Sequence, residues 1–150
     1  MLEIILILNA LWFAMGFNVF SIRNKIFAKL VVPREQRDTP VFNILAESGR
    51  FLGGFNFAFM LCNILLVTNL DVFPSNEQRA ILLFVFAVAH GSQFVFNVPV
   101  AIQNRRGGGV WQVLKGTMLF IFVTDFIMMA LNLALAAMFT FLAIHSIMIS

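Results

Sequence analysis

The chain contains no tyrosine, one cysteine, four prolines and few charged residues, which make up 11% of its 150 residues. The lone Cys62 cannot form an intramolecular disulfide, which excludes a disulfide-stabilised scaffold. The absence of tyrosine excludes a tyrosyl general acid or redox residue. Soluble domains carry about 25% charged residues. With 61% hydrophobic residues and a mean hydropathy of +0.93, the chain is therefore neither a water-soluble globular enzyme nor a disordered protein.

Long apolar runs are what the sequence does contain. They predict an all-α integral membrane four-helix bundle, because a lipid-embedded backbone must satisfy its own hydrogen bonds and a barrel would need alternating polarity. One transmembrane domain spans residues 1–150, with helices over about 2–20, 51–69, 80–102 and 116–145. The second is preceded by an amphipathic lead-in from Val41, and Pro99 interrupts the third near its end. The fourth run stays apolar to Ile149, which predicts a tilted or projecting helix.

The loops differ in charge, and this difference predicts orientation. Loop 21–40 has an excess of basic residues, with Arg23, Lys25, Lys29, Arg34 and Arg37 against Glu35 and Asp38. Loop 103–115 has the basic residues Arg105, Arg106 and Lys115 and no acid. Residues 70–79 have the acids Asp71 and Glu77 against the one base Arg79. The positive-inside rule places loops 21–40 and 103–115 on the cytoplasmic or matrix side and both termini on the non-cytoplasmic side. The membrane is a bacterial inner membrane or an organelle membrane. Because the basic residues are explained by orientation in the membrane, we expect no nucleic-acid partner.

Basic loop 21–40 also has apolar residues at helical spacing, among them Ile22, Ile26, Phe27 and Leu30. We expect the end of the first helix to run onto the membrane surface, where each basic residue near anionic headgroups contributes about 1 kcal/mol. The alternative is that these cations set topology only. In loop 103–115, Trp111 suits the membrane interface.

Polar residues interrupt each apolar run at i, i+3, i+7 spacing, which places them on one side of a helix. The four stripes are Asn9, Trp12 and Gly16; Glu47, Arg50 and Gly54; His90, Gln93 and Asn97; and Asp125, Met128 and Asn132. A further set on a neighbouring face of the second helix is Gly53, Asn56, Met60 and Asn63. Polar side chains are costly in lipid, so the stripes are expected to face the bundle interior.

Asp125 and His90 are the candidate catalytic residues. A carboxylate at the centre of a membrane helix costs about 2.5–3.5 kcal/mol, so we expect Asp125 to be protonated or paired with His90 or Arg50. The pair fits a proton relay, an acid–base catalyst or a ligand anchor, and equally a structural hydrogen bond between helices. The candidate ligand-binding residues are Glu47, Arg50, Asn56, His90, Gln93, Asn97 and Asp125. Of these, Glu47 and Arg50 have the spacing of an intrahelical ion pair.

Metal and haem sites lack the necessary ligand spacing. No E-x-x-H, H-E-x-x-H or paired-cysteine motif is present. His145 lies twenty residues after Asp125, about 30 Å along a straight helix, too far from His90 for a bis-histidine haem. We expect no cofactor and no metal.

The plan of about four helices resembles the DoxX-like membrane proteins and their relatives with an EXPERA domain. The resemblance rests on the segment ESGRFLGGFNFAFML, with Arg50 before Gly53 and Gly54, and on polar residues within the third and fourth helices. Membership of the EXPERA group would imply sterol isomerase activity, with Glu47, His90 and Asp125 as the matching residue types. DoxX-like proteins accompany other membrane proteins. The small number of acids and tryptophans favours a role beside other membrane proteins over isomerase activity.

Three functions compete. The first is an accessory or structural subunit of a larger membrane complex, or a homo-oligomer, because no complete catalytic motif is present. The second is a protein that binds a lipid, sterol or quinone within the bundle, with acid–base chemistry at His90 and Asp125. The third is an oligomeric proton-coupled carrier that depends on Asp125. In every case the bilayer is a partner, and a binding or structural role is expected rather than an enzyme.

Overall fold

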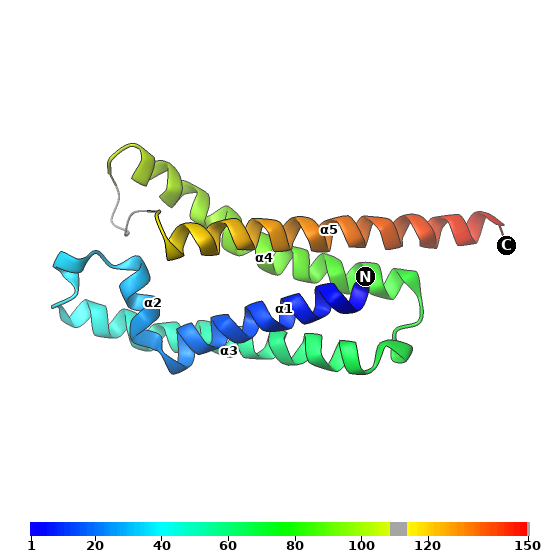
Figure 1. Cartoon of the computed structure of the whole chain (residues 1–150), viewed down its shortest axis with the longest axis horizontal. Helices are drawn as coiled ribbons and strands as arrows, with labels where there is room; N and C mark the ends of the chain where they lie inside the picture. The colour runs from blue at the N-terminus through cyan, green and yellow to red at the C-terminus, as the bar shows by residue number, and fades with distance from the viewer. Residues whose placement is uncertain (109–113, 150) are drawn as a thin grey trace.

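The computed structural model describes residues 1–108 and 114–149, and the regular secondary structure in them is helical (Figure 1). The chain runs through α1 (Leu2–Phe17), the π-helical turn η1 (Asn18–Ile22), α2 (Asn24–Val31), η2 (Arg34–Gln36), α3 (Pro40–Thr68), η3 (Leu70–Val72), α4 (Asn76–Arg105) and α5 (Thr117–Ile149). Four of these segments are long and apolar enough to cross a membrane: Leu2–Ile22, Pro40–Thr68, Asn76–Arg105 and Thr117–Ile149. The predicted all-α architecture with four candidate spans is confirmed.

The helix ends follow local signals. Pro40 occupies the first turn of α3, where a missing N–H costs nothing. Ser75 begins α4 with a capping box, in which its Oγ accepts from the Gln78 backbone N–H at 3.2 Å and the Gln78 side chain accepts from the Ser75 N–H at 3.3 Å. At the end of α2, Arg37 donates to the carbonyls of Lys29 and Val32, as basic side chains near a helix C-terminus commonly do.

Two boundaries differ from the sequence prediction. The amphipathic lead-in from Val41 is part of α3 itself, which begins at Pro40 rather than near residue 51. Pro99 does not interrupt α4, which continues to Arg105. Proline removes one backbone donor but need not end a helix, and kinked membrane helices tolerate it.

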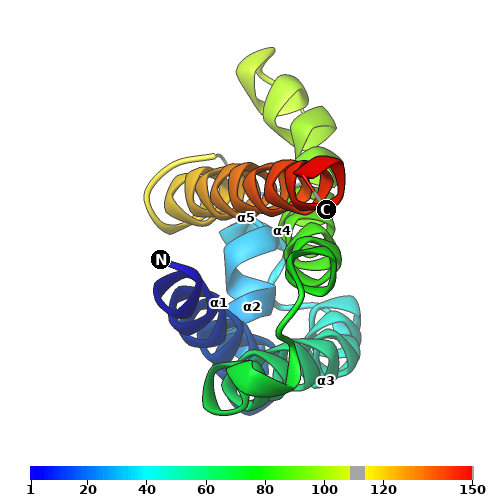
Figure 2. The ribbon, with the colours of Figure 1, turned by 90° about the vertical axis from the view of Figure 1, so that its right-hand side faces the viewer.

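The four long helices form two pairs, α1 with α3 and α4 with α5 (Figure 1). The pairs lie close together near the N-terminus and diverge toward the other end of the molecule. There the short helix α2 stands across the gap between them (Figures 1 and 2). Loop 21–40 is thus folded into the bundle, with Asn24 and Ala28 of α2 buried.

The core sits where the two pairs converge. Two clusters fill it: Ile5, Ala80, Leu83, Leu135, Ala136 and Phe139; and Leu6, Phe13, Leu66 and Phe86. A third cluster, Ala28, Phe42 and Ala46, fixes α2 on α3. Many large apolar side chains face outward, which suits a helix bundle whose solvent is hydrocarbon.

Small residues set the closest approaches. A Cβ added at Gly53 would collide with Ser21 of η1, and one added at Gly16 would collide with Asn56 of α3. At Gly53, η1 therefore packs directly against the backbone of α3. The neighbouring Gly54 has no such contact, because nothing lies within 4 Å of a Cβ built there.

Candidate functional site

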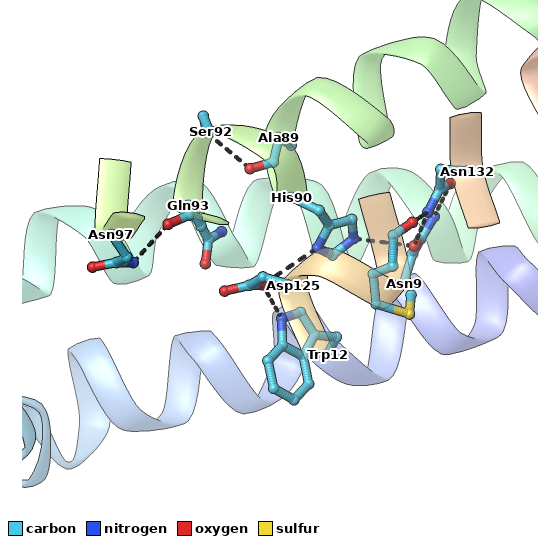
Figure 3. Close-up of polar contacts among 10 residues, drawn as sticks. Asn9, Trp12, Ala89, His90, Ser92, Gln93, Asn97, Asp125 and Asn132 are labelled. Atoms are coloured by element: carbon cyan, nitrogen blue, oxygen red, sulfur yellow. Dashed lines mark hydrogen bonds and ion pairs between the residues drawn. The ribbon is translucent and has the colours of Figure 1, made fainter. Parts of the chain in front are cut away.

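A chain of buried polar side chains joins α1, α4 and α5 (Figure 3). Asn9 and Asn132 exchange two hydrogen bonds of 2.9 Å, and Nδ2 of Asn132 also donates to the Met128 carbonyl at 2.8 Å. Nε2 of His90 lies 3.1 Å from Oδ1 of Asn9. On its other side, Nδ1 of His90 lies 3.7 Å from Oδ1 of Asp125. Asn9, His90, Asp125 and Asn132 are each at most 1% exposed, so the expectation that these residues face the interior is confirmed.

The Met128 carbonyl fixes the direction of this chain. A carbonyl only accepts, so the group of Asn132 that faces it is the NH₂. The same NH₂ meets Asn9, so Asn9 presents its Oδ1 there, and that oxygen also faces His90. An amide oxygen only accepts, so Nε2 of His90 carries a hydrogen and donates it. The tautomer is thereby assigned from the hydrogen-bond network.

Asp125 joins the two helix pairs. Its Oδ1 accepts a 2.8 Å hydrogen bond from Nε1 of Trp12 on α1 and is the atom nearest to His90 on α4. Its Oδ2 is buried and has no hydrogen-bond partner among the described residues. In Figure 3 this second oxygen points away from His90 and Trp12, toward the part of α4 that carries Gln93 and Asn97.

A cavity of about 750 Å³ lies between the two helix pairs on that side of Asp125. Its walls are the facing parts of α1, η1, α3, α4 and α5, and Phe27, Leu30 and Val31 of α2 line it at the end where the pairs diverge. Most lining residues are apolar. The polar ones are Trp12, Asn56, Ser92, Gln93, Asn97 and Asp125. The volume lies within the range of about 300–1,000 Å³ that is typical of small-molecule sites.

The cavity wall includes exposed residues of α3 and α4. On α3, Leu52 and Phe55 line it and are 47% and 56% exposed, and on α4 Val88 and Phe96 line it and are 53% and 79% exposed. Met15 of α1 also lines the cavity and is 43% exposed, and Trp12 and Phe120 bridge α1 and α5 by an edge-to-face contact at 5.8 Å. The exposed residues of α3 and α4 form an apolar rim, which suits a surface in contact with lipid chains.

The predicted ligand-binding residues divide into two groups. Asn56, Gln93, Asn97 and Asp125 line the cavity, and His90 lies directly behind Asp125. Asn56 and Asn97 donate to carbonyls of their own helices, those of Leu52 and Gln93. The side chain of Gln93 makes no hydrogen bond within the part of the chain that the structure describes, so its amide is available to a ligand.

Glu47 and Arg50 are not part of the cavity lining. They form the predicted i,i+3 ion pair at 3.3 Å, with side chains 62% and 59% exposed, and Asn24 of α2 donates to Glu47. The prediction that the stripe Glu47, Arg50 and Gly54 faces the interior is wrong. The small residues Gly49 and Gly53 occupy the inward face of α3 and contact Phe27 and Ser21. A charged pair placed near the end of a membrane helix can face outward.

The helical spacing predicted in loop 21–40 is confirmed as α2, in which Ile26 is exposed. Phe27 and Leu30 of this helix line the cavity. The placement of loop 21–40 at a membrane surface stays a prediction. The apolar face of a short amphipathic helix packs on the nearest protein surface when one is available. The predicted interfacial Trp111 lies outside the described residues.

Three residues that contact Asp125, His90 or one another in the site are not among the predicted site residues. Trp12, Asn9 and Asn132 belong to the predicted inward stripes only. The shared spacing of Asn9 and Trp12 on α1, and of Asp125 and Asn132 on α5, was the signal available.

Within the described part of the chain, no three His, Cys, Asp or Glu side chains group as metal ligands. His145 lies exposed near the end of α5, where it contacts Phe141 and not the site. Comparison with protein-family models, with curated proteins and with solved structures finds no match. The DoxX-like resemblance therefore stays a prediction, and function must be argued from the site itself.

Proposed function

We propose that this protein is an integral membrane protein that binds a lipid-like small molecule, such as a sterol or a quinone, between its two helix pairs. The observation that carries the proposal is the buried, unpartnered Oδ2 of Asp125 at the wall of a largely apolar 750 Å³ cavity. A buried polar atom without a partner costs about 1–3 kcal/mol. A ligand that supplies the missing hydrogen bond recovers this free energy.

The shape and lining of the cavity support this function. An apolar chamber with a few convergent polar groups is the usual form of a small-molecule site. Four of the six polar lining residues, Ser92, Gln93, Asn97 and Asp125, belong to the α4–α5 pair, so an amphiphile has a more polar and a more apolar wall to match. The apolar rim between α3 and α4 provides entry from the membrane. Within this proposal loops 21–40 and 103–115 lie on the cytoplasmic or matrix side, as their charges predict.

The test is purification from the native membrane in mild detergent, followed by mass spectrometry of everything that accompanies the chain. We expect one defined small molecule with the wild type and with Asp71→Asn, a matched substitution in an exposed loop position. We expect loss of that molecule in Asp125→Leu and in Ser92→Phe. The second variant places a bulky ring in the cavity from the α4 wall and leaves the buried polar chain intact.

Absence of any defined small molecule from the folded wild type overturns the proposal. Retention of the molecule in a folded Ser92→Phe variant overturns its location. A stoichiometric protein partner without a small molecule would instead favour the accessory-subunit hypothesis. Proton uptake by proteoliposomes that is abolished in Asp125→Leu would favour the carrier.

A further inference from the structure

We propose that the ligand is an uncharged amphiphile whose polar end is a hydroxyl group that donates a hydrogen bond to Oδ2 of Asp125. This inference rests on the proposed function and specifies its ligand. Three steps carry it: the position of a proton between His90 and Asp125, the consequence for Oδ2, and the charge of the cavity wall.

The first step concerns the facing atoms of His90 and Asp125. The Met128–Asn132–Asn9 chain requires a hydrogen on Nε2 of His90. Neutral imidazole then has a bare lone pair at Nδ1, only 3.7 Å from Oδ1 of Asp125. Two acceptors facing each other in a buried site repel. A proton placed between them, on Nδ1 or on Oδ1, converts the repulsion into attraction.

The second step follows for the other carboxyl oxygen. When the proton lies between Nδ1 and Oδ1, Oδ2 carries none and can only accept a hydrogen bond. Moving the proton to Oδ2 would restore the repulsion between His90 and Oδ1. The group that satisfies Oδ2 must therefore be a donor, which a hydroxyl is and a ketone or ether oxygen is not.

The third step concerns charge. Among the described residues that line the cavity there is no Lys, Arg or His, and Asp125 is the ionisable one. With one shared proton, the His90–Asp125 pair has no net charge. A phosphate, carboxylate or ammonium headgroup would therefore find no net counter-charge in this wall. An uncharged polar group carries the smallest desolvation cost in this wall.

The test uses four fluorescent probes with one apolar body: 1-pyrenebutanol, its methyl ether, 1-pyrenebutylamine and 1-pyrenebutyrate. The protein carries Trp111→Phe, which leaves Trp12 in the cavity wall as its one tryptophan. In nanodiscs of zwitterionic lipid, quenching of Trp12 by pyrene reports binding. The same protein with Ser92→Phe, which places a bulky ring in the cavity, gives the background from probe dissolved in the bilayer.

We expect the alcohol to bind at least about tenfold more tightly than the ether. The ether oxygen has no hydrogen to donate, so it would face Oδ2 of Asp125 as a second buried acceptor. The amine and the carboxylate are expected to bind more weakly than the alcohol. In Asp125→Asn, Trp12 still requires an oxygen, so the amide presents Oδ1 to Trp12 and its NH₂ to the ligand. The preference for alcohol over ether should then fall to about twofold or less, whereas a purely structural role for Asp125 would weaken both probes alike.

Equal binding of alcohol and ether to the wild type overturns the hydroxyl inference and leaves the proposed function standing. Tighter binding of the amine or the carboxylate overturns the uncharged ligand. If all four probes quench Trp12 no more than they do in the Ser92→Phe protein, the proposed function is overturned together with this inference.

Discussion

Trp12 and Asp125 lie 113 residues apart in the chain, and the indole Nε1–H of Trp12 donates a 2.8 Å hydrogen bond to Oδ1 of Asp125. The bond joins α1 of one helix pair to α5 of the other. Its donor cannot be replaced by phenylalanine, although phenylalanine preserves most of the ring area.

Trp12→Phe is therefore expected to lower the free energy of unfolding by about 1 kcal/mol, the usual size of a hydrogen bond between membrane helices. Thermal or denaturant unfolding in detergent measures the change. Phe84→Leu, at an exposed position of α4, is the control and should leave stability within about 0.5 kcal/mol of the wild type. Equal effects of the two substitutions would contradict a structural role for the Trp12–Asp125 bond.

Asn9 and Asn132 are expected to be energetically coupled. Asn9→Ala leaves Oδ1 of Asn132 without its partner, and Asn132→Ala leaves Nδ2 of Asn9 without its partner. Each loss costs about 1–3 kcal/mol. The double variant removes both amides at once, so its loss of stability should be smaller than the sum of the single losses. A double-mutant cycle of unfolding free energies measures this, and strict additivity would show that the two amides do not act as a pair.

Gly53 and Gly54 form a matched comparison on α3. Gly53→Ala is expected to destabilise the protein by about 1–3 kcal/mol, because the new methyl group would collide with Ser21 of η1. Gly54→Ala meets open space and should be neutral or slightly stabilising, since alanine favours a helix more than glycine does. The unfolding free energies of the two variants, each compared with the wild type, measure this difference. A greater loss at Gly54 would contradict the packing of η1 on α3.

The orientation proposed from the loop charges can be measured with single cysteines. In a Cys62→Ala background, Glu35→Cys in loop 21–40 and Asp71→Cys in η3 introduce exposed labelling sites. In intact bacterial cells expressing the protein, a membrane-impermeant maleimide should label Cys at 71 and spare Cys at 35, and inverted vesicles should show the reverse. The opposite pattern would place loop 21–40 outside the cell.

Much of the fold follows from the sequence because hydrocarbon imposes strong constraints. Continuous apolar runs predicted four long helices, and the cost of polar groups in lipid predicted that Asn9, His90, Asp125 and Asn132 face inward. The same rule failed for Glu47 and Arg50. Spacing identifies a helix face, and it does not show that a charged pair near a helix end can remain outside.

The contacts between helices could not be predicted in the same way. The Trp12–Asp125 bond depends on the axial register of α1 against α5, which the pattern within either helix does not specify. The position of α2 across the gap depends on how far the two helix pairs diverge. Neither the cavity nor the unpartnered Oδ2 of Asp125 has a signature in one helix alone, because both arise where several helices meet.

For the proposed ligand, entry past the apolar rim of Leu52 and Phe55 on α3 and Val88 and Phe96 on α4 would determine which concentration governs occupancy. A ligand that enters there comes from the bilayer, so its mole fraction among the lipids sets saturation rather than its concentration in water. Added lipid then dilutes the ligand by surface dilution even when the aqueous volume is unchanged. Affinities for this protein are therefore comparable between preparations only at a stated ratio of ligand to lipid.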